Sequence, residues 1–378
     1  MTRHLASAMG AAIVALLLAG CEPGQKISTQ TGFRGAGVQQ IVDRSSIAEA
    51  VAIPPEAYPL PPDGGPRASE IYQNVQVLGA VSTERFNHLM AQMNQWVVPT
   101  NLPEAQQGCN YCHNPENMAS DEKYTKVVAR RMLQMTRTIN SRWSSHVQKT
   151  GVTCYTCHRG NAVPANVWTL KDGTPNPGSI RGNKRGQNTP EPNVGYASLP
   201  SDIFAAYFQG KGNIRVASSK VHPSPDHVVS TKAAEQSYGL MMHVSSALGV
   251  NCTYCHNSQS FRAWNLSSAQ RATAYYGIRM VRDANENYIT SLQAVFPANR
   301  KGPKGDPYKV NCTTCHQGLP KPLGGVSMIA QAPSLRGPPM ATAAAEGGPG
   351  AATTVPEAFN NPSAMTVKNE PAPTAARQ

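Results

Sequence analysis

The sequence predicts a mainly α-helical protein that is built from four similar units and contains little regular strand. Three observations lead to this fold class. The pattern Cys-x-x-Cys-His occurs four times in 378 residues. Each copy follows a stretch in which apolar side chains recur with a helical period. Aromatic residues make up only 6% of the chain, which contains 31 Gly and 31 Pro, so protein side chains alone are expected to form a modest core.

The repeated motif is typical of covalent haem attachment, in which both thiols bind the porphyrin and the adjacent His binds the iron. A zinc half-site or a redox dithiol could also use Cys-x-x-Cys, but neither requires the His that follows all four copies. We therefore expect four covalently bound haem c groups, which would form much of the core. The thiols that would hold them are Cys109, Cys112, Cys154, Cys157, Cys252, Cys255, Cys312 and Cys315, and the axial histidines are His113, His158, His256 and His316.

The first residues predict export and a lipid anchor. Residues 1–20 combine Arg3 with a mostly apolar stretch, as in a secretory signal peptide, and this stretch is too short to span a bilayer. The sequence Leu-Ala-Gly-Cys that ends at Cys21 resembles a bacterial lipobox, in which the Cys is diacylated. Cys21 is also the one cysteine outside the motifs. Two acyl chains would hold the protein stably on the membrane; an ordinary signal peptide with a stray Cys is the alternative.

The formal net charge is +12, but the balance of charge differs along the chain. Nucleic acid is not an expected partner, because an exported haem protein has no access to it. Between Asp63 and Lys123 seven acids accompany three bases, whereas between Lys171 and Lys220 seven bases accompany three acids. The first haem region is therefore locally acidic and could dock a basic carrier. Ordinary solvated surface charge is the alternative interpretation.

Composition and motif positions divide the chain into six regions. A Pro-rich arm and a Gly/Pro-rich connection lack helical periodicity, and a C-terminal stretch of Pro, Gly, Ala and Thr cannot bury enough surface to fold. The regions are a signal peptide (1–20), a lipid-anchored extended arm (21–65), a first haem pair (66–165), a connecting segment (166–225), a second haem pair (226–332) and a disordered tail (333–378). An internal duplication is the simplest origin of two pairs of units.

One amphipathic helix is expected before each motif. The expected helices carry the apolar stripe Phe86–Val97, the stripe Val128–Trp143 extended past His146 to Gly151, the span Thr231–Leu248 and a span from about Ser268 to Leu292. In each unit a loop then leads to the motif.

The second axial ligand decides the chemistry of each iron, because Met raises the reduction potential, His lowers it and water leaves an open site. The first three helices each offer a Met on the apolar side. These candidates are Met90, Met132 and Met241, with Met93, Met135 and Met242 as neighbours that could substitute. A single helical Met is usually core packing, but its recurrence beside successive haem motifs favours ligation.

His146 is a further candidate ligand. It follows Met132 by 14 residues, which on a straight helix is about 21 Å and about 40° short of four turns. Both side chains could then face the same way without reaching the same iron, so they must serve different haems. Repetition alone would instead offer Met280, on the fourth helix, to the fourth haem.

Several stretches resemble one known family closely. They are Arg130-Arg131-Met132-Leu133, His146 together with Gly151 to Gly160, Leu240-Met241-Met242, Asn251 to Asn257, and Gly277-Ile278-Arg279-Met280-Val281-Arg282. The family is the tetrahaem cytochrome c subunit of the purple-bacterial photosynthetic reaction centre, and the resemblance spans roughly residues 65 to 330. In that family three haems are ligated by His and Met, and the fourth by two His, one of them from the helix before the second motif. The resemblance therefore implies His146 rather than Met280, and Met90 rather than Met93.

This resemblance implies electron transfer without catalysis, and we expect no catalytic residues. Members sit on the periplasmic face of the reaction-centre core and re-reduce the photo-oxidised special pair of bacteriochlorophylls. A soluble cytochrome c or a high-potential iron–sulfur protein refills their haems. The third-motif haem is nearest the special pair and the first is distal. Either Arg271 or Arg279 would then raise the third haem's potential by disfavouring its oxidised charge.

Two other functions are alternatives. A multihaem reductase would need an iron with an open position, whereas all four motifs are regular and four second ligands are at hand. A free-standing periplasmic tetrahaem carrier would need no membrane partner. The predicted lipid anchor and the Pro-rich arm favour a membrane partner over that second alternative.

Overall fold

The computed structural model describes residues 25–30, 39–171, 191–210, 212–216 and 230–337. The predicted signal peptide, Cys21 and residues 338–378 of the predicted tail lie outside the described residues. None of the described helices combines the length and the apolar character needed to cross a bilayer.

Four long helices form the frame of the molecule: α4 (Thr83–Val97), α5 (Tyr124–Arg142), α8 (Thr231–Leu248) and α9 (Ala269–Asp283). They confirm the mainly helical fold class, and each precedes one motif as predicted. The bounds of α8 are those predicted. At its start the Ser230 side chain accepts a hydrogen bond from the backbone N–H of Ala233, and at its end Gly249 adopts a left-handed conformation (φ 62°).

The remaining elements are short. The α-helical ones are α2 (Arg44–Val51), α3 (Ala68–Ile71), α6 (Ser144–Val147), α7 (Cys154–His158) and α10 (Cys312–His316). The 3₁₀ turns are η1 (Glu104–Gln106), η2 (Gly108–Tyr111), η3 (Pro192–Val194), η5 (Cys252–Tyr254), η7 (Thr290–Leu292), η8 (Ala298–Arg300), η9 (Pro322–Gly325) and η10 (Pro333–Arg336). Two π-helical turns, η4 (Ala205–Gln209) and η6 (Ala284–Ile289), complete the set.

The second long helix is shorter than predicted. α5 ends at Arg142 because Trp143 leaves the helical region (φ −102°, ψ 28°), and α6 follows as a separate turn. The prediction of one helix running past His146 to Gly151 was therefore wrong, and the straight-helix geometry assumed for His146 does not apply. The indole Nε1 of Trp143 donates a 2.7 Å hydrogen bond to Asp283 of α9, which stabilises the break.

The N-terminal arm contains regular structure that the sequence did not indicate. Strand β1 (Lys26–Gln30) pairs antiparallel with β2 (Gln39–Asp43), and α2 follows directly. Residues 52–66 then run without a helix or strand. Tyr155 donates a hydrogen bond to the carbonyl of Ala52, and Arg159 donates one to the carbonyl of Ala50. The arm therefore lies against the second motif.

Two clusters of buried side chains form the core, one around α4 and α5 and one around α6, α8, α9 and η4. The connecting segment contributes to the second cluster through Val194, Ile203 and Phe208, all fully buried. Residues 333–337 differ from the prediction of a disordered tail. Leu335 on η10 is fully buried, and Asn140 of α5 donates a 2.7 Å hydrogen bond to its carbonyl.

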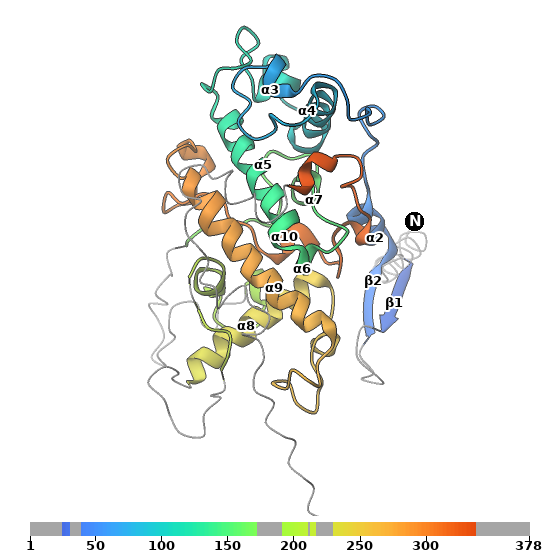
Figure 1. The fold of residues 1–378 in the computed structure, drawn as a ribbon. Coiled ribbons are helices and arrows are strands. Elements are labelled where there is room, and N and C mark those ends of the chain that lie inside the picture. The colour runs from blue at the N-terminus through green and yellow to red at the C-terminus, as the bar shows by residue number, and fades with distance from the viewer. Residues whose placement is uncertain (1–24, 31–38, 172–190, 211, 217–229, 338–378) are drawn as a thin grey trace, which may run out of the picture.

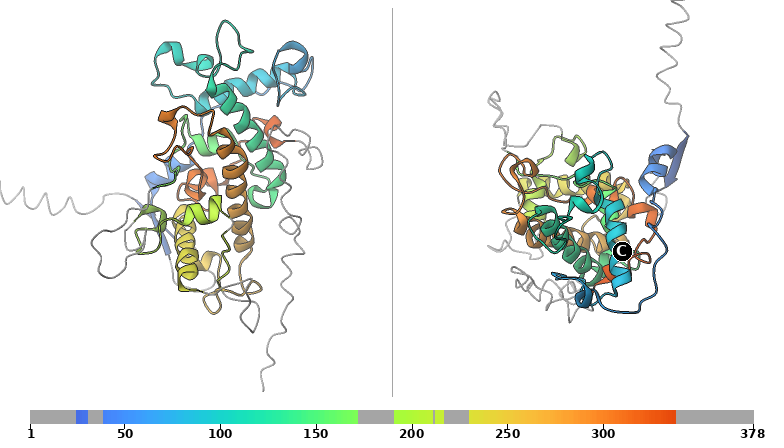
Figure 2. Two further views of the ribbon diagram at one scale, coloured as in Figure 1. Left: turned by 90° about the vertical axis from the view of Figure 1, so that its left-hand side faces the viewer. Right: turned by 90° about the horizontal axis from the view of Figure 1, so that it is seen from above.

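The molecule is elongated, with α3 and α4 at one end, α8 at the other, and α7 and α10 between them (Figure 1). The left-hand view of Figure 2, turned by 90° about the vertical axis, keeps this order. α7 packs on α4, α10 packs on α8, and α7 and α10 contact each other. The second and fourth motifs therefore meet in the middle, while the first and third lie toward opposite ends.

Candidate haem centres

The second and fourth motifs fold in the same way, each as one turn of α-helix. Each turn begins with a capping box, formed by Thr153 and Thr156 in α7 and by Asn311 and Thr314 in α10. Each ends at a left-handed residue, Arg159 (φ 49°) or Gln317 (φ 50°). The shared geometry makes α7 and α10 structural copies of each other.

The first and third motifs share a different local fold, which starts with a 3₁₀ turn. The Asn that follows the motif His accepts a 2.9 Å hydrogen bond from the backbone N–H two residues further on, in both copies. A hydroxyl near the start of the next helix then donates to the carbonyl of the motif Tyr, from Thr125 to Tyr111 and from Ser268 to Tyr254, at 2.6 Å in both. The units therefore alternate, first like third and second like fourth, as a duplication of a two-unit piece predicts.

In all four motifs the Nδ1 atom of the His lies at hydrogen-bonding distance from a downstream backbone carbonyl. The pairs are His113 with Met118, His158 with Asn161, His256 with Phe261 and His316 with Leu319, at 2.9, 2.8, 2.7 and 2.9 Å. A carbonyl can only accept, so Nδ1 carries the proton and the Nε2 lone pair is free for a metal. Burial lowers the pKa of His316 to about 4, which keeps that ring in the neutral form that binds metals.

Equivalent hydrogen bonds align α4 with α8. After the second motif, the N–H of Gly160 donates to the carbonyl of Trp96 on α4, and after the fourth motif the N–H of Gly318 donates to the carbonyl of Ala247 on α8, at 2.9 Å in both. Trp96 and Ala247 therefore occupy equivalent positions in the two halves of the molecule.

This register distinguishes the methionines of α4 and α8. Met90 precedes Trp96 by six residues, and Met241 precedes Ala247 by six, so Met90 and Met241 are equivalent. Met93 has Val244 as its counterpart and therefore no equivalent Met. In addition, the terminal methyl of Met242 lies against Gly195.

A side-chain amide ties α5 to the second motif, and another ties the α9–η6 segment to the fourth motif. Asn140 donates to the carbonyl of Val152 at 2.9 Å and accepts from its N–H at 2.7 Å. Asn285 makes the same two bonds to Val310, both at 2.9 Å. Each of these valines precedes the first Cys of a motif by two residues. Asn140 and Asn285 are therefore equivalent, and they fix the register of α5 against α9–η6.

The same register extends to the start of the two helices. Lys126 and Arg271 each precede the equivalent Asn by 14 residues, and each donates hydrogen bonds to the loop before its own helix. Counting back eight residues from each Asn pairs Met132 with Gly277, not with Met280. Met280 pairs with Met135 and is buried in the core cluster around α9.

His146 lies next to the His of the fourth motif. The ring centroids of His146 and His316 are 6.0 Å apart. An iron bound by one nitrogen of each ring, with metal–nitrogen distances of about 2 Å, would separate the two ring centres by about 6 Å. Nδ1 of His146 lies 2.9 Å from the carbonyl of Thr273 on α9, so its Nε2 is also free. The two rings can bind the same metal ion.

The second and fourth motifs also contact each other through their cysteines. The thiols of Cys157 and Cys315 are hydrogen-bonded, and this contact together with burial raises the pKa of Cys157. Burial also raises the pKa values of Cys154 and Cys312 to about 12. Cys154 is buried and Cys157, Cys312 and Cys315 are half-buried, so apolar groups attached to them would be partly shielded from water by the protein.

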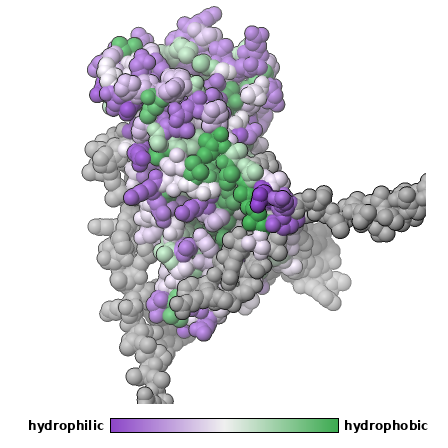
Figure 3. Space-filling view, turned by 90° about the vertical axis from the view of Figure 1, so that its right-hand side faces the viewer, coloured by the Kyte–Doolittle hydropathy of each residue, from purple (hydrophilic) through white to green (hydrophobic). Residues whose placement is uncertain are grey.

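The residues around the motifs fit a haem. Several buried polar atoms have no hydrogen-bond partner among the described residues, including the indole N–H of Trp96, the amide of Gln92 and two guanidinium nitrogens of Arg159. Buried donors need partners, and the carboxylates of haem propionates would supply them. Apolar side chains also reach the surface halfway along the face that carries α2 (Figure 3). Free Nε2 atoms, two thiols in each motif, buried donors without partners and apolar surface all match a haem.

The structure brings each predicted cysteine into a motif turn and leaves Met90, Met132 and Met241 half-buried on the helices before the first three motifs. Sequence reasoning did not identify three residue roles: the clamps made by Asn140 and Asn285, and the open position at Gly277. Only the recurrence of a basic residue and an Asn, 14 residues apart on both helices, could have signalled them.

The Cys-x-x-Cys-His motif occurs in two local geometries that alternate along the chain, and in every copy a backbone carbonyl fixes the histidine. These features define a c-type cytochrome, a protein that binds haem covalently. The family model of the photosynthetic reaction centre cytochrome c subunit matches residues 22–336. The chain therefore belongs to that family.

Relatives of the same name are similar over most of their length. The subunit of Rubrivivax gelatinosus is 48% identical over 336 residues, covering 88% of this chain and 90% of the relative. That of Thermochromatium tepidum is 44% identical, covering 85% and 78%. That of Roseobacter denitrificans is 39% identical, covering 83% and 86%.

Proposed function

We propose that this chain, which is an electron-transfer subunit of the photosynthetic reaction centre like the other members of its family, carries four haem c groups. The observation that carries the proposal is the set of four motif histidines whose Nδ1 atoms are held by carbonyls and whose Nε2 atoms are free. The haems supply reversible one-electron chemistry at iron. The chain holds each of them by two cysteines and two axial side chains, and it needs no catalytic residue.

The internal register and the position of His146 support an axial assignment. The proposed pairs are His113 with Met90, His158 with Met132, His256 with Met241 and His316 with His146. The equivalence of Met90 and Met241 supports the first and third pairs, and the 6.0 Å between His146 and His316 supports the fourth. With both positions filled on every iron, the protein is suited to electron transfer and not to binding a small substrate.

The motifs follow the order first, second, fourth, third along the long axis, as the contact of α7 with α10 supports. We propose that the end with the third motif faces the special pair in the reaction-centre core and re-reduces it. The end with the first motif then faces the periplasm and the soluble donor. Diacylated Cys21 would keep the subunit on the periplasmic side of the membrane.

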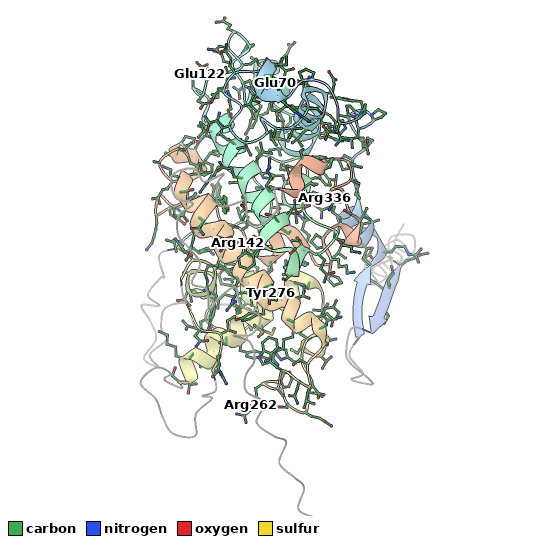
Figure 4. The ribbon with its side chains drawn as sticks, viewed as in Figure 1. Glu70, Glu122, Arg142, Arg262, Tyr276 and Arg336 are labelled. Carbon is green, nitrogen blue, oxygen red and sulfur yellow. The ribbon has the colours of Figure 1, made fainter. Side chains whose placement is uncertain are left out.

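The surface near the first motif supports a basic donor. Glu70, Glu104, Glu116 and Glu122 are exposed there, and Glu70 and Glu122 lie at this end of the molecule (Figure 4). A basic soluble cytochrome c would be steered by such a surface. A high-potential iron–sulfur protein is the second carrier class, and the salt dependence of its reaction would show whether it uses the same surface.

Two measurements test the proposal. Haem content of the purified full chain should be four per polypeptide by alkaline pyridine haemochrome and protein mass. In native membranes, a light flash should oxidise the haems promptly, and a soluble carrier should re-reduce them. Haems that stay inert to light would contradict the reaction-centre role and leave a free periplasmic carrier. A haem that binds carbon monoxide at rest would indicate a reductase instead.

A further inference from the structure

Gly277 is an unusual residue for its position, in the interior of α9. Glycine inside a helix costs about 1 kcal/mol relative to alanine, so its presence calls for a steric reason. A Cβ atom at Gly277 would lie 2.5 Å from Cε1, 2.8 Å from Nδ1 and 3.1 Å from Nε2 of His146. The imidazole of His146 thus occupies the space that any side chain at position 277 would need.

Position 277 of the fourth unit is also equivalent to the position at which the second unit carries its methionine. The clamps made by Asn140 and Asn285 pair Met132 with Gly277. On a helix the Cα–Cβ bond tilts toward the N-terminus, so a side chain at 277 would lie over the preceding turn. That turn contains Thr273, whose carbonyl holds Nδ1 of His146. His146 therefore lies where the side chain of a methionine at 277 would lie.

The break after α5 is what delivers His146 to this place. Trp143 leaves the helix and is tied by its indole to Asp283 near the end of α9, and His146 contacts α9 two to three turns earlier. Asn285, two residues beyond Asp283, clamps Val310 just before the fourth motif. The α9–η6 segment therefore positions both His146 and the motif that carries His316.

We propose that Gly277 is the ligand position of the fourth unit, emptied of its side chain so that His146 of α6 fills the space and serves the fourth haem in place of a methionine. The proposal rests on the axial assignment given above. Gly277 is a positioning residue: it touches the ligand His146 and not the iron.

The test uses the full chain with its haems attached. In the wild-type protein, near-infrared magnetic circular dichroism should show one His/His haem beside three His/Met haems. In His146→Ala the His/His signal should disappear, and one haem should become high-spin and bind carbon monoxide. In His146→Ala/Gly277→Met a fourth His/Met signal should appear, carbon monoxide binding should be lost, and the potential of that haem should rise above its wild-type value.

A matched control places the new methionine on the adjacent residue. Tyr276 lies about 100° away around the helix, so His146→Ala/Tyr276→Met should keep the high-spin, carbon-monoxide-binding haem. A double variant at 277 that behaves like the His146→Ala single variant would overturn the proposal. So would rescue by the Tyr276 control, because rescue would then not depend on position 277.

Gly277→Ala tests the same idea without a new ligand. Its methyl should displace the imidazole, so the His/His signal should shift or be lost, whereas in a His146→Ala background the same methyl should be tolerated. A His/His signal unchanged by Gly277→Ala would refute the positioning role of Gly277 and leave the axial assignment standing. Absence of any His/His signal from the wild-type protein would instead refute the axial assignment.

Discussion

The loop after the first motif and the loop after the third motif share one backbone design but differ in surface chemistry. Both follow a motif that contains a 3₁₀ turn, and both place a carbonyl five residues after the motif His against its Nδ1 atom. The residues that supply this carbonyl, Met118 and Phe261, are exposed to nearly the same extent, 50% and 51%. The scaffold that orients the motif His is therefore constant.

The side chains around that scaffold differ at the two ends. The first loop carries Glu116, Asp121 and Glu122, whereas the third exposes Trp264 and Leu266 and has no acid between its motif and Asp283. Glu122 and Arg262 mark these opposite ends in Figure 4. Exposed apolar groups mark interaction sites, and acidic surfaces steer basic partners. The first and third units thus share a backbone design, whereas their surfaces differ as the two proposed partners would require.

The largest expected effect is on reaction with a soluble donor. Reversing Glu104, Glu116 and Glu122 to Lys should lower the second-order rate with a basic cytochrome c by about tenfold or more at low ionic strength, because steering turns into repulsion. Stopped-flow kinetics against salt measure this, and the difference should shrink as the Debye length falls. Arg262→Glu, at the other end, is the matched control and should leave the rate unchanged. A rate that does not depend on salt in the wild-type protein would refute electrostatic docking.

The third loop should matter for assembly instead. Phe261→Ala should weaken binding to the reaction-centre core by about tenfold, or ~1.4 kcal/mol, because a buried aromatic anchor contributes this much at an interface. Binding is measured as salt-resistant retention on membranes, in a Cys21→Ala background without the proposed anchor. Met118→Ala removes an equally exposed apolar side chain at the equivalent position and should have no effect. Equal losses from both substitutions would show that the two loops are not specialised.

Much of the fold could be predicted because helical periodicity and caps are local signals. The bounds of α8 follow from Ser230 and Gly249. The break at Trp143 could not be predicted, because it depends on a hydrogen bond to Asp283, 140 residues away in sequence. The ordered turn at Pro333–Arg336 escaped prediction for the same reason, since η10 packs on α5 and Asn140 is hydrogen-bonded to the carbonyl of Leu335, 195 residues away in sequence.

The candidate site likewise contains residues that the sequence predicts and residues that only tertiary contacts reveal. The cysteines and motif histidines follow from a five-residue pattern, and His146 from a family resemblance. Repetition in sequence suggested Met280 for the fourth haem, because it is the methionine on the fourth helix. The clamp between Asn285 and Val310 shows that Gly277, not Met280, matches Met132. A register between helices is set by such tertiary contacts, so a sequence alone does not reveal it.

A smaller difference between the ends concerns one basic residue on the helix that follows each loop. Arg271 stacks over Trp264 at 4.2 Å, whereas Arg279 stacks over Tyr275. Burial raises the pKa of Cys255 to about 11 and lowers the pKa of His256; the charge of Arg271 opposes the first shift and adds to the second. The equivalent Lys126 is paired with Asp121 at 3.3 Å, which offsets its charge. Arg271→Gln should therefore lower the third haem's potential by some tens of millivolts, measured by redox titration. Lys126→Gln should change the first haem's potential less, and an equal or larger change would contradict this account.

The smallest expected effect is the acid sensitivity of the first loop. Hydrogen bonds from Arg130 lower the pKa of Asp121 from 3.8 to about 2. A lowered folded-state pKa means that the carboxylate stabilises the fold above about pH 4 and loses this effect as the pH falls toward 2. Because Asp121 is partly exposed, Asp121→Asn should cost about 0.5–1 kcal/mol at pH 7.

The difference in unfolding free energy between wild type and Asp121→Asn, measured by denaturant titration, should shrink below about pH 4 and be lost as the pH falls through about 2. The third loop is held instead by Arg271 through the carbonyl of Ala263 and the hydroxyl of Ser267, groups that do not titrate in this range. The cost of Arg271→Gln should therefore stay constant between pH 7 and pH 2. If both costs fall together, an ion pair does not account for the difference between the two loops.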